Sequence, residues 1–219
     1  MKYFILSIDD GTVYDAKTVA ILNRLNLKAT FNLNSGLDDY VWYNQGRPIR
    51  RLRLKENAFL YKGHEKASHT LTHPYLDSCP DEEIVRQVNE DITNLESIFG
   101  EEIVSFATPF ETCGDRECQI IKTKTKIKDI RVSKIDESFA MPIDPYFIPC
   151  TCFEIDRALE LFPSFLGKEG DALFVYAGHS YDFELGKSWD KLEKLLLQVL
   201  DNGVKTITMK ELLSLIKRN

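Results

Sequence analysis

Four clusters of polar residues in this 219-residue sequence contain side chains that can bind a metal ion or transfer a proton. They are Asp9-Asp10-Gly11, the run from Ser68 to Pro74, Thr108-Pro109-Phe110, and His179-Ser180. Taken singly, each has an ordinary explanation, because Asp-Asp-Gly commonly forms a turn and single histidines commonly make structural hydrogen bonds. Three of the chain's four histidines nevertheless fall in these clusters. A carboxylate with two imidazoles is a sound ligand set for a catalytic divalent metal with open coordination positions.

The pair His69 and His73 gives one reason to expect metal binding. On a helical turn, residues four apart present their rings to the same side, which suits two ligands of one ion. The alternative is that both histidines are simply solvated in a polar loop. Their spacing alone leaves this choice open.

The clusters lie where predicted strands end. Apolar runs predict strands at residues 3–8, 29–33, 104–107, 130–133, 146–153, 173–177 and 204–207. Apolar residues at helical spacing predict helices between them, the clearest of which starts at Pro80 and stops at Gly100. This alternation predicts an α/β fold with a mostly parallel sheet, open or closed into a barrel. In such folds chemistry gathers at the carboxyl ends of the strands, where three of the four clusters are expected.

The composition is that of one ordinary soluble domain. Hydrophobic residues make up 43% of the chain and charged residues 28%. The net charge of −6 gives no general attraction to nucleic acid or to an anionic membrane. The first apolar run is too short for a secretion signal, no run is long enough to span a bilayer, and the five cysteines are an odd number. These features predict a cytoplasmic protein, and they leave its oligomeric state open.

The motifs and their order resemble the polysaccharide deacetylase family, the NodB-homology domain, which is similar to carbohydrate esterase family 4. Ser7 to Gly11 resembles the family's first motif, and Gly63 to Pro74 closely resembles its second. Phe106 to Phe110 occupies the place of the third motif, and Tyr176 to Ser180 resembles the last. The motifs span nearly the whole chain, so we expect one such domain over residues 1–219.

This resemblance implies a distorted β/α barrel that hydrolyses an N-acetyl group with the help of a divalent metal. It assigns Asp10, His69 and His73 as ligands, usually of zinc, with nickel, cobalt or manganese as alternatives. It makes Asp9 the general base and His179 the general acid. The expected substrate is a small molecule or an oligosaccharide that carries the N-acetyl group.

Three features depart from the family pattern. Ala107 stands where the family normally has an arginine that orients the base, so the sequence identifies no partner for Asp9. Phe110-Glu111 replaces Tyr-Gly, but the main-chain N–H of Phe110 remains a plausible donor to the acetyl oxygen. The family's fourth motif, an aspartate near a tryptophan that supports the catalytic histidine, cannot be placed, because Trp189 follows His179.

Residues 36–62 form a longer connection than the family's core requires, with a hairpin strand expected at residues 49–54. The segment contains Trp42, Tyr43 and four arginines, which are Arg47, Arg50, Arg51 and Arg53. The plainer interpretation is a solvated hairpin or an oligomer contact, and the other is a lid that contacts an anionic or extended substrate. The cysteines are expected to be buried or idle thiols, because their spacing is not a usual zinc pattern.

Two other functions fit the same sequence. The first is hydrolysis of a small, non-sugar C–N bond, because polymers such as peptidoglycan lie outside the cell and the chain shows no secretion signal. The second is a degenerate barrel that binds carbohydrate or metal without turnover, because the usual arginine is missing. The intact metal, base and acid positions argue against the second. The sequence therefore predicts a metal-dependent deacetylase whose substrate remains open.

Overall fold

Eight strands form one sheet and two more form a hairpin in the computed structural model, which describes residues 1–216. Residues 217–219 of the predicted domain lie outside the described part. The strands are β1 (Lys2–Asp9), β2 (Thr30–Leu33), β3 (Val41–Asn44), β4 (Arg47–Arg50), β5 (Glu65–Ser68), β6 (Ser105–Ala107), β7 (Asp129–Ile135), β8 (Ile148–Cys150), β9 (Ala172–His179) and β10 (Lys205–Thr206). The helices are α1 (Asp15–Arg24), α2 (Leu54–Asn57), α3 (Asp81–Phe99), α4 (Asp115–Lys124), α5 (Ile155–Gly167), α6 (Ser180–Leu185), α7 (Trp189–Asp201) and α8 (Met209–Ile216), with short 3-10 helices η1 (Ala58–Tyr61) and η2 (Leu76–Ser78).

Strand β1 lies at the centre of the sheet. It pairs in parallel with β9 along its full length, which places Asp9 directly opposite His179. Its other edge is shared, because β10 pairs near its start and β2 pairs with its last three residues. Beyond β2 the order is β5, β6, β7 and β8, and each neighbouring pair is parallel.

The sheet curls back on itself after β8. A parallel bridge joins Cys152 to Tyr176 of β9, and the Ala177 N–H donates to the Cys152 carbonyl at 3.1 Å. The path from β9 through β1 and round to β8 therefore returns to β9. This arrangement confirms the predicted α/β fold, a distorted barrel of mostly parallel strands.

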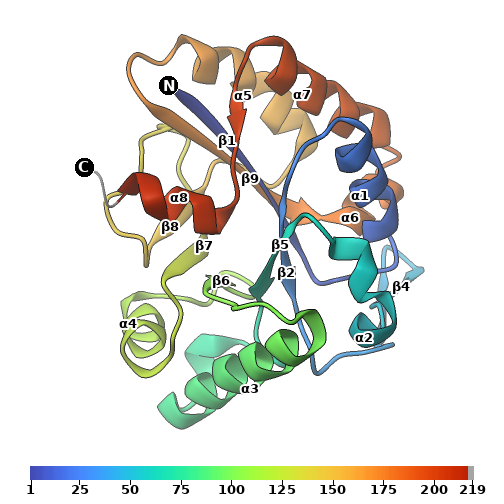
Figure 1. The fold of residues 1–219 in the computed structure, drawn as a ribbon, viewed down its shortest axis with the longest axis vertical. Coiled ribbons are helices and arrows are strands. Elements are labelled where there is room, and N and C mark those ends of the chain that lie inside the picture. The colour runs from blue at the N-terminus through green and yellow to red at the C-terminus, as the bar shows by residue number, and fades with distance from the viewer. Residues whose placement is uncertain (217–219) are drawn as a thin grey trace.

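Helices surround the sheet, with α3 and α4 on one side of the strands and α5 and α7 on the opposite side in Figure 1. Nearly every residue of β1 and of β9 is buried. Such continuous burial is typical of parallel strands whose two faces are both covered. The strand ends that carry Asp9 and His179 are therefore anchored in the hydrophobic core.

Helix α3 keeps its predicted boundaries and contacts the second motif. Pro80 precedes its first turn, and Gly100 ends it with a φ of +69°, a left-handed conformation that glycine adopts without strain. One face of the helix buries Asp91, whose carboxylate accepts hydrogen bonds from the Ser68 hydroxyl at 2.6 Å and from the His69 N–H at 3.3 Å. Packing of this helix thus fixes the chain at the end of β5.

Two predicted strands differ from the observed ones. The strand expected at residues 146–153 shortens to β8, because the residues that follow β8 leave β7 and pair with β9. The strand expected at residues 49–54 ends at Arg50. There the Leu52 N–H donates to the Gly11 carbonyl at 2.8 Å and ties the chain to the end of β1 instead.

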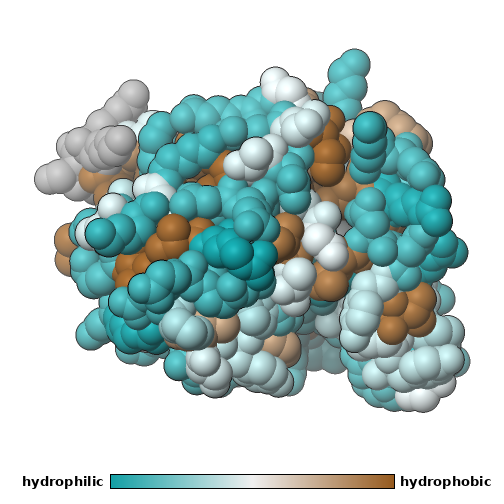
Figure 2. Space-filling view, turned by 90° about the horizontal axis from the view of Figure 1, so that it is seen from below, coloured by the Kyte–Doolittle hydropathy of each residue, from teal (hydrophilic) through white to brown (hydrophobic). Residues whose placement is uncertain are grey.

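Hydrophilic residues cover most of the face seen in Figure 2, where hydrophobic residues appear as separate patches. The most exposed large apolar side chains, Ile143, Phe59 and Tyr43, belong to different segments. Within residues 1–216, no helix combines the length and hydrophobicity needed to cross a bilayer.

A buried pair of carboxyl groups lies at the amino ends of the strands, away from the predicted chemistry. The Ser105 hydroxyl is 2.6 Å from Glu65 Oε1 and 2.8 Å from Asp129 Oδ2. A hydroxyl has only one proton, so one of these contacts requires a protonated carboxyl group. Burial raises the pKa of Glu65 and raises that of Asp129 well above its ordinary value. The folded protein therefore holds a proton here that the unfolded chain releases.

This proton makes stability depend on pH. Because the folded pKa of Asp129 exceeds its unfolded value of about 3.9, its contribution is complete below that value and is lost as the pH rises through the folded pKa. Between about pH 5 and about pH 8, Asp129→Asn should lose less of its free energy of unfolding than the wild type in urea titrations. The exposed Asp201→Asn variant is the control, and its free energy of unfolding should change with pH as that of the wild type does. If the free energy of unfolding of Asp129→Asn changed with pH as that of the wild type does, the two carboxyl groups would not share a proton.

Candidate metal centre

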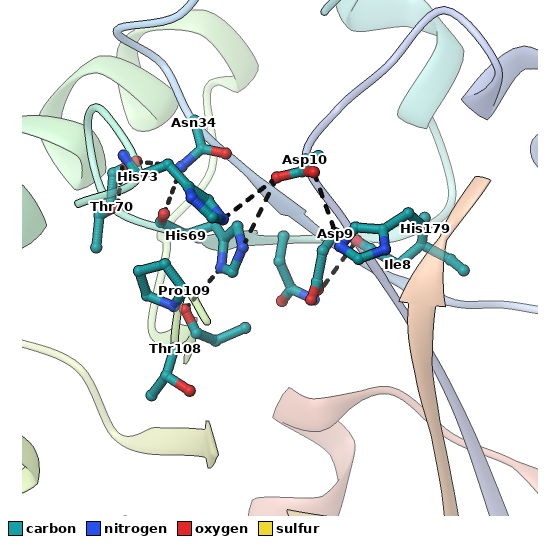
Figure 3. A network of polar contacts seen from close by, with 12 residues as sticks. Ile8, Asp9, Asp10, Asn34, His69, Thr70, His73, Thr108, Pro109 and His179 are labelled. Atoms are coloured by element: carbon teal, nitrogen blue, oxygen red, sulfur yellow. Dashed lines mark hydrogen bonds and ion pairs between the residues drawn. The ribbon is translucent and has the colours of Figure 1, made fainter. Parts of the chain in front are cut away.

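The carboxyl ends of three strands bring the predicted chemistry together (Figure 3). Asp9 ends β1 and Asp10 follows it, His69 follows β5, and His179 ends β9. The rings of His69, His73 and His179 point toward the Asp10 carboxylate. Nε2 of His73 lies 3.5 Å and Nε2 of His69 lies 3.9 Å from Asp10 Oδ1, while Nε2 of His179 lies 3.7 Å from Asp10 Oδ2.

The three predicted ligands form one group. Asp10, His69 and His73 each offer a ligand atom, and these atoms all lie within 4.8 Å of one another. Zinc binds imidazole nitrogen and carboxylate oxygen at about 2.0–2.2 Å, so both measured separations from Asp10 fit a shared ion. Of the histidine, cysteine and acidic side chains in residues 1–216, only these three make such a group. The cysteines contribute to no site of this kind in that part of the chain.

The histidine pair lies in a loop, so the helical-turn explanation of its spacing is wrong. Thr70 and His73 both have left-handed backbone conformations, with φ of +69° and +55°. The His73 N–H donates to the Thr70 hydroxyl at 3.0 Å and closes this tight turn. The rings of His69 and His73 still meet edge to face, with 4.8 Å between their centroids.

The protonation states suit a metal site. Nδ1 of His69 lies 2.8 Å from the Ala107 carbonyl, which can only accept, so Nδ1 carries the proton and Nε2 presents its lone pair toward Asp10. Burial lowers the pKa of His69 and that of His73. Burial alone would raise the pKa of Asp10, but the charges of Arg51 and of the neighbouring histidines lower it. Neutral imidazoles and an ionised carboxylate are the forms that bind a metal.

Arg131 is the partner of Asp9 that the sequence did not identify. Its Nη2 lies 2.5 Å from both carboxylate oxygens of Asp9, and Asn32 Nδ2 lies 2.6 Å from Asp9 Oδ1. The Arg131 side chain is only 1% exposed. Asp9 is therefore held in one orientation by a buried arginine and an amide.

The position of Arg131 explains why Ala107 is tolerated. The two residues lie directly opposite each other in the β6–β7 pair. Paired residues of adjacent strands point to the same face of a sheet, so an arginine one strand away reaches the same carboxylate. A sequence signal existed, since Arg131 interrupts a buried apolar run between Ile130 and Val132. A buried charge at such a position requires a partner.

Asp182 supports His179, in place of the family aspartate that could not be located. Its Oδ2 lies 2.8 Å from His179 Nδ1 and accepts the His179 N–H at 3.3 Å at the start of α6. Burial alone would lower the pKa of His179, but the hydrogen bond to Asp182 and the charges of Asp10 and Asp9 raise it to about 9. His179 is thus protonated at neutral pH. The sequence signal for this contact was local, because Asp182 is the third residue of helix α6, which begins directly after His179.

Phe110 lies at the mouth of the site on a strained turn, with a φ of +53°. Its ring meets His73 edge to face at 4.4 Å and stacks on Tyr75 at 4.1 Å, both measured between centroids. The Phe110 N–H makes no hydrogen bond within residues 1–216. It is therefore free to donate to a ligand.

A cavity of about 630 Å³ joins these groups. The five predicted metal, base and acid residues all line it. Aromatic side chains form much of its wall, namely those of Tyr40, Trp42, Phe110, Phe153 and Tyr181. Its volume lies in the range of pockets that enclose small organic ligands.

Comparisons with known proteins identify the family and proteins of similar fold. The family profile described as polysaccharide deacetylase matches residues 1–125, and no curated protein sequence matches the chain significantly. The fold is similar to that of a family 4 acetyl xylan esterase from Clostridium thermocellum in complex with a cobalt ion, at 15% identity and a TM-score of 0.66 over 98% of this chain and 91% of that chain. It is also similar to the peptidoglycan deacetylase PdaC from Bacillus subtilis, at 16% identity and a TM-score of 0.63 over 99% of this chain and 92% of that chain. A third similar structure is BA3943, a CE4 family pseudoenzyme from Bacillus anthracis, at 20% identity and a TM-score of 0.63 over 97% of this chain and 65% of that chain. These identities indicate a shared fold, and the chain spans less than two thirds of the pseudoenzyme.

Proposed function

Because the chain belongs to the polysaccharide deacetylase family, we propose that it is a metal-dependent hydrolase that removes an N-acetyl group from a sugar or an oligosaccharide. One observation carries the proposal. The group of Asp10, His69 and His73 lies beside the arginine-bound Asp9 and beside His179, whose pKa is raised to about 9, and all five residues line one cavity. Metal-assisted amide hydrolysis uses such a combination of metal ligands, base and acid.

We infer that Asp10, His69 and His73 hold one divalent ion, with zinc the first candidate for a site of two imidazoles and a carboxylate. Cobalt, nickel and manganese suit the same donors, and one structural neighbour holds cobalt. When bound, the ion lowers the pKa of water from about 15.7 toward about 7 and polarises a carbonyl oxygen.

The remaining residues would move protons and orient the substrate. Asp9, fixed by Arg131, accepts the proton of the attacking water. The Phe110 N–H donates to the acetyl oxygen as negative charge develops on it. His179 donates its Nε2 proton to the leaving nitrogen as the C–N bond breaks, which yields acetate and an amine. Asp182 holds the His179 ring through Nδ1, so that Nε2 faces the cavity.

The walls of the cavity favour a ring-shaped substrate. Aromatic side chains such as Trp42 and Tyr181 can cover the apolar face of a sugar ring, and two structural neighbours are named for acetyl xylan and peptidoglycan. The net charge of −6 gives no reason to expect nucleic acid as a partner. Small non-sugar amides remain the alternative substrate class. A non-catalytic barrel is the other alternative, since one neighbour is a pseudoenzyme.

The direct test is acetate release from N-acetylglucosamine, its oligomers and small N-acetyl amides. Acetate should be released from the sugars, should stop after metal removal with a chelator, and should resume when zinc or cobalt is added back. Release from small amides alone would establish the alternative substrate. No release from any compound by the metal-loaded protein would indicate a non-catalytic barrel.

A ligand variant links this activity to the site. His73→Ala removes one of three metal ligands, so it should retain much less metal by elemental analysis while keeping its circular dichroism spectrum. His64→Ala is the matched control, because His64 bonds Asn23 and lies outside the ligand group. Wild-type metal content in His73→Ala would remove His73 from the ligand set.

A further inference from the structure

We propose that Arg51 of the 36–62 segment is a built-in counter-ion of Asp10, which organises the site without metal and limits its affinity for metal. The inference rests on the metal site proposed above and adds a residue to it. It assigns a role in the site to a segment that the sequence left as either a solvated hairpin or a lid.

Arg51 contacts Asp10 at two points. Its Nη2 lies 2.8 Å from Asp10 Oδ1, and its Nη1 donates to the Asp10 carbonyl and to Asn34 Oδ1. Both side chains of the ion pair are only 6% exposed. The pair is therefore a buried one, in which charge acts far more strongly than at the surface.

The backbone around Arg51 is tied to the same turn. Arg51 forms an antiparallel bridge with Thr12, and its neighbours bond to Val13 and Gly11 at 3.0 and 2.8 Å. Asp10 itself has a φ of +83°, which is uncommon for a residue with a side chain. The segment thus holds the strained turn that presents the Asp10 carboxylate.

Only one arginine of the segment acts in this way. Arg50 and Arg53 are more than half exposed and both bond to Asp39. The guanidinium of Arg51 instead faces Trp42, 5.2 Å from its ring centroid, and Trp42 packs edge to face on Tyr181 at 5.5 Å. The hairpin therefore fixes Arg51 against the cavity wall.

The charge of Arg51 should affect metal affinity more than its hydrogen bonds to Asp10 do. Asp10 has other supports, since its N–H donates to the Asn32 carbonyl at 3.0 Å and the Tyr181 hydroxyl lies 3.4 Å from Oδ2. The second buried arginine, Arg131, is committed to Asp9. When the metal is absent, Arg51 is therefore the largest positive influence on Asp10, with His179 the next, and its fixed charge repels a doubly charged ion that binds the same oxygen. Removing this charge should strengthen metal binding.

The test compares variants that separate charge from hydrogen bonding. Arg51→Gln keeps an amide donor but loses the charge, and Arg51→Lys keeps the charge. Zinc and cobalt dissociation constants are measured by competition with a chelator, together with the melting temperature with and without metal. Arg51→Gln should bind at least about tenfold more tightly than the wild type and gain more stability from metal. The metal dissociation constants of Arg51→Lys should lie within about threefold of those of the wild type. The exposed Arg50→Gln variant is the control, and it should bind metal as the wild type does.

Each outcome bears on a separate claim. Equal or weaker binding by Arg51→Gln overturns the counter-ion role of Arg51 while leaving the metal site intact. If Arg51→Gln folds only when metal is added, the metal has replaced the missing charge, which supports the role. If Arg51→Gln does not fold even with metal, the test depends on Arg51→Lys. A change beyond about tenfold in the metal dissociation constant of Arg51→Lys then overturns the proposal. A wild-type protein that binds no metal contradicts the proposed metal site instead.

Discussion

An Arg131→Ala variant is expected to lose both stability and turnover, and moving the arginine to position 107 is expected to restore much of each. Without Arg131, the Asp9 carboxylate keeps only the Asn32 amide as a side-chain partner inside the barrel. Removal of one partner of a buried ion pair costs about 3–5 kcal/mol. For a protein of this length, that corresponds to a fall in melting temperature of about 6–20 °C.

The double variant Arg131→Ala with Ala107→Arg makes this prediction specific. Position 107 faces position 131 across the β6–β7 pair, so the new arginine starts from the adjacent strand on the same face. Melting temperature and acetate release should both rise above those of Arg131→Ala. Ala107→Arg alone is the control, and it should destabilise the protein by about 1–3 kcal/mol, because Arg131 already fills the space. Failure of the double variant to recover would mean that the two positions are not equivalent.

The second large effect is expected from Asp9→Asn. Asparagine keeps the shape of aspartate but cannot take a proton from water, so turnover should fall by about 10²–10⁴-fold. Metal content should stay near that of the wild type, because Asp9 lies outside the ligand group. Some stability should also be lost, since Arg131 then has no charged partner.

Asp129→Asn is a matched control for this variant. It makes the same substitution at a buried carboxyl group, but at the opposite end of the strands and outside the cavity. It should keep wild-type kcat for acetate release at neutral pH. Full activity in Asp9→Asn would remove Asp9 as the base, and loss of metal would reassign it to the ligand set.

The fold alone does not decide whether this barrel is active, because the neighbours of similar fold include both a deacetylase and a pseudoenzyme. The chain's own residues support activity. The two supports that its motifs lack, for the predicted base Asp9 and for the predicted acid His179, are supplied by Arg131 and Asp182. Departures from a family motif are therefore better judged by the contacts at the site than by the motif itself.

The sequence by itself determined the α/β class, and its family resemblance assigned Asp10, His69 and His73 to one group, although strand β5, which precedes His69, was not predicted. Apolar runs mark the strands, and parallel strands bring their carboxyl ends to one edge, so residues at strand ends are predicted to meet. The contact of His179 with Asp182 was also within reach, because it spans only one helical turn.

Only the tertiary structure decided what surrounds these residues. Arg131 lies 122 residues from Asp9 in sequence and Arg51 lies 41 residues from Asp10, yet both pairs are buried ion pairs. Such pairings depend on which strands become neighbours and in which register, and on how a long connection folds back over a strand end. Local periodicity carries neither kind of information, because it records burial and spacing but not lateral partners. The sequence could therefore predict which side chains gather at the site, while the buried arginines that pair with Asp9 and with Asp10 required the fold.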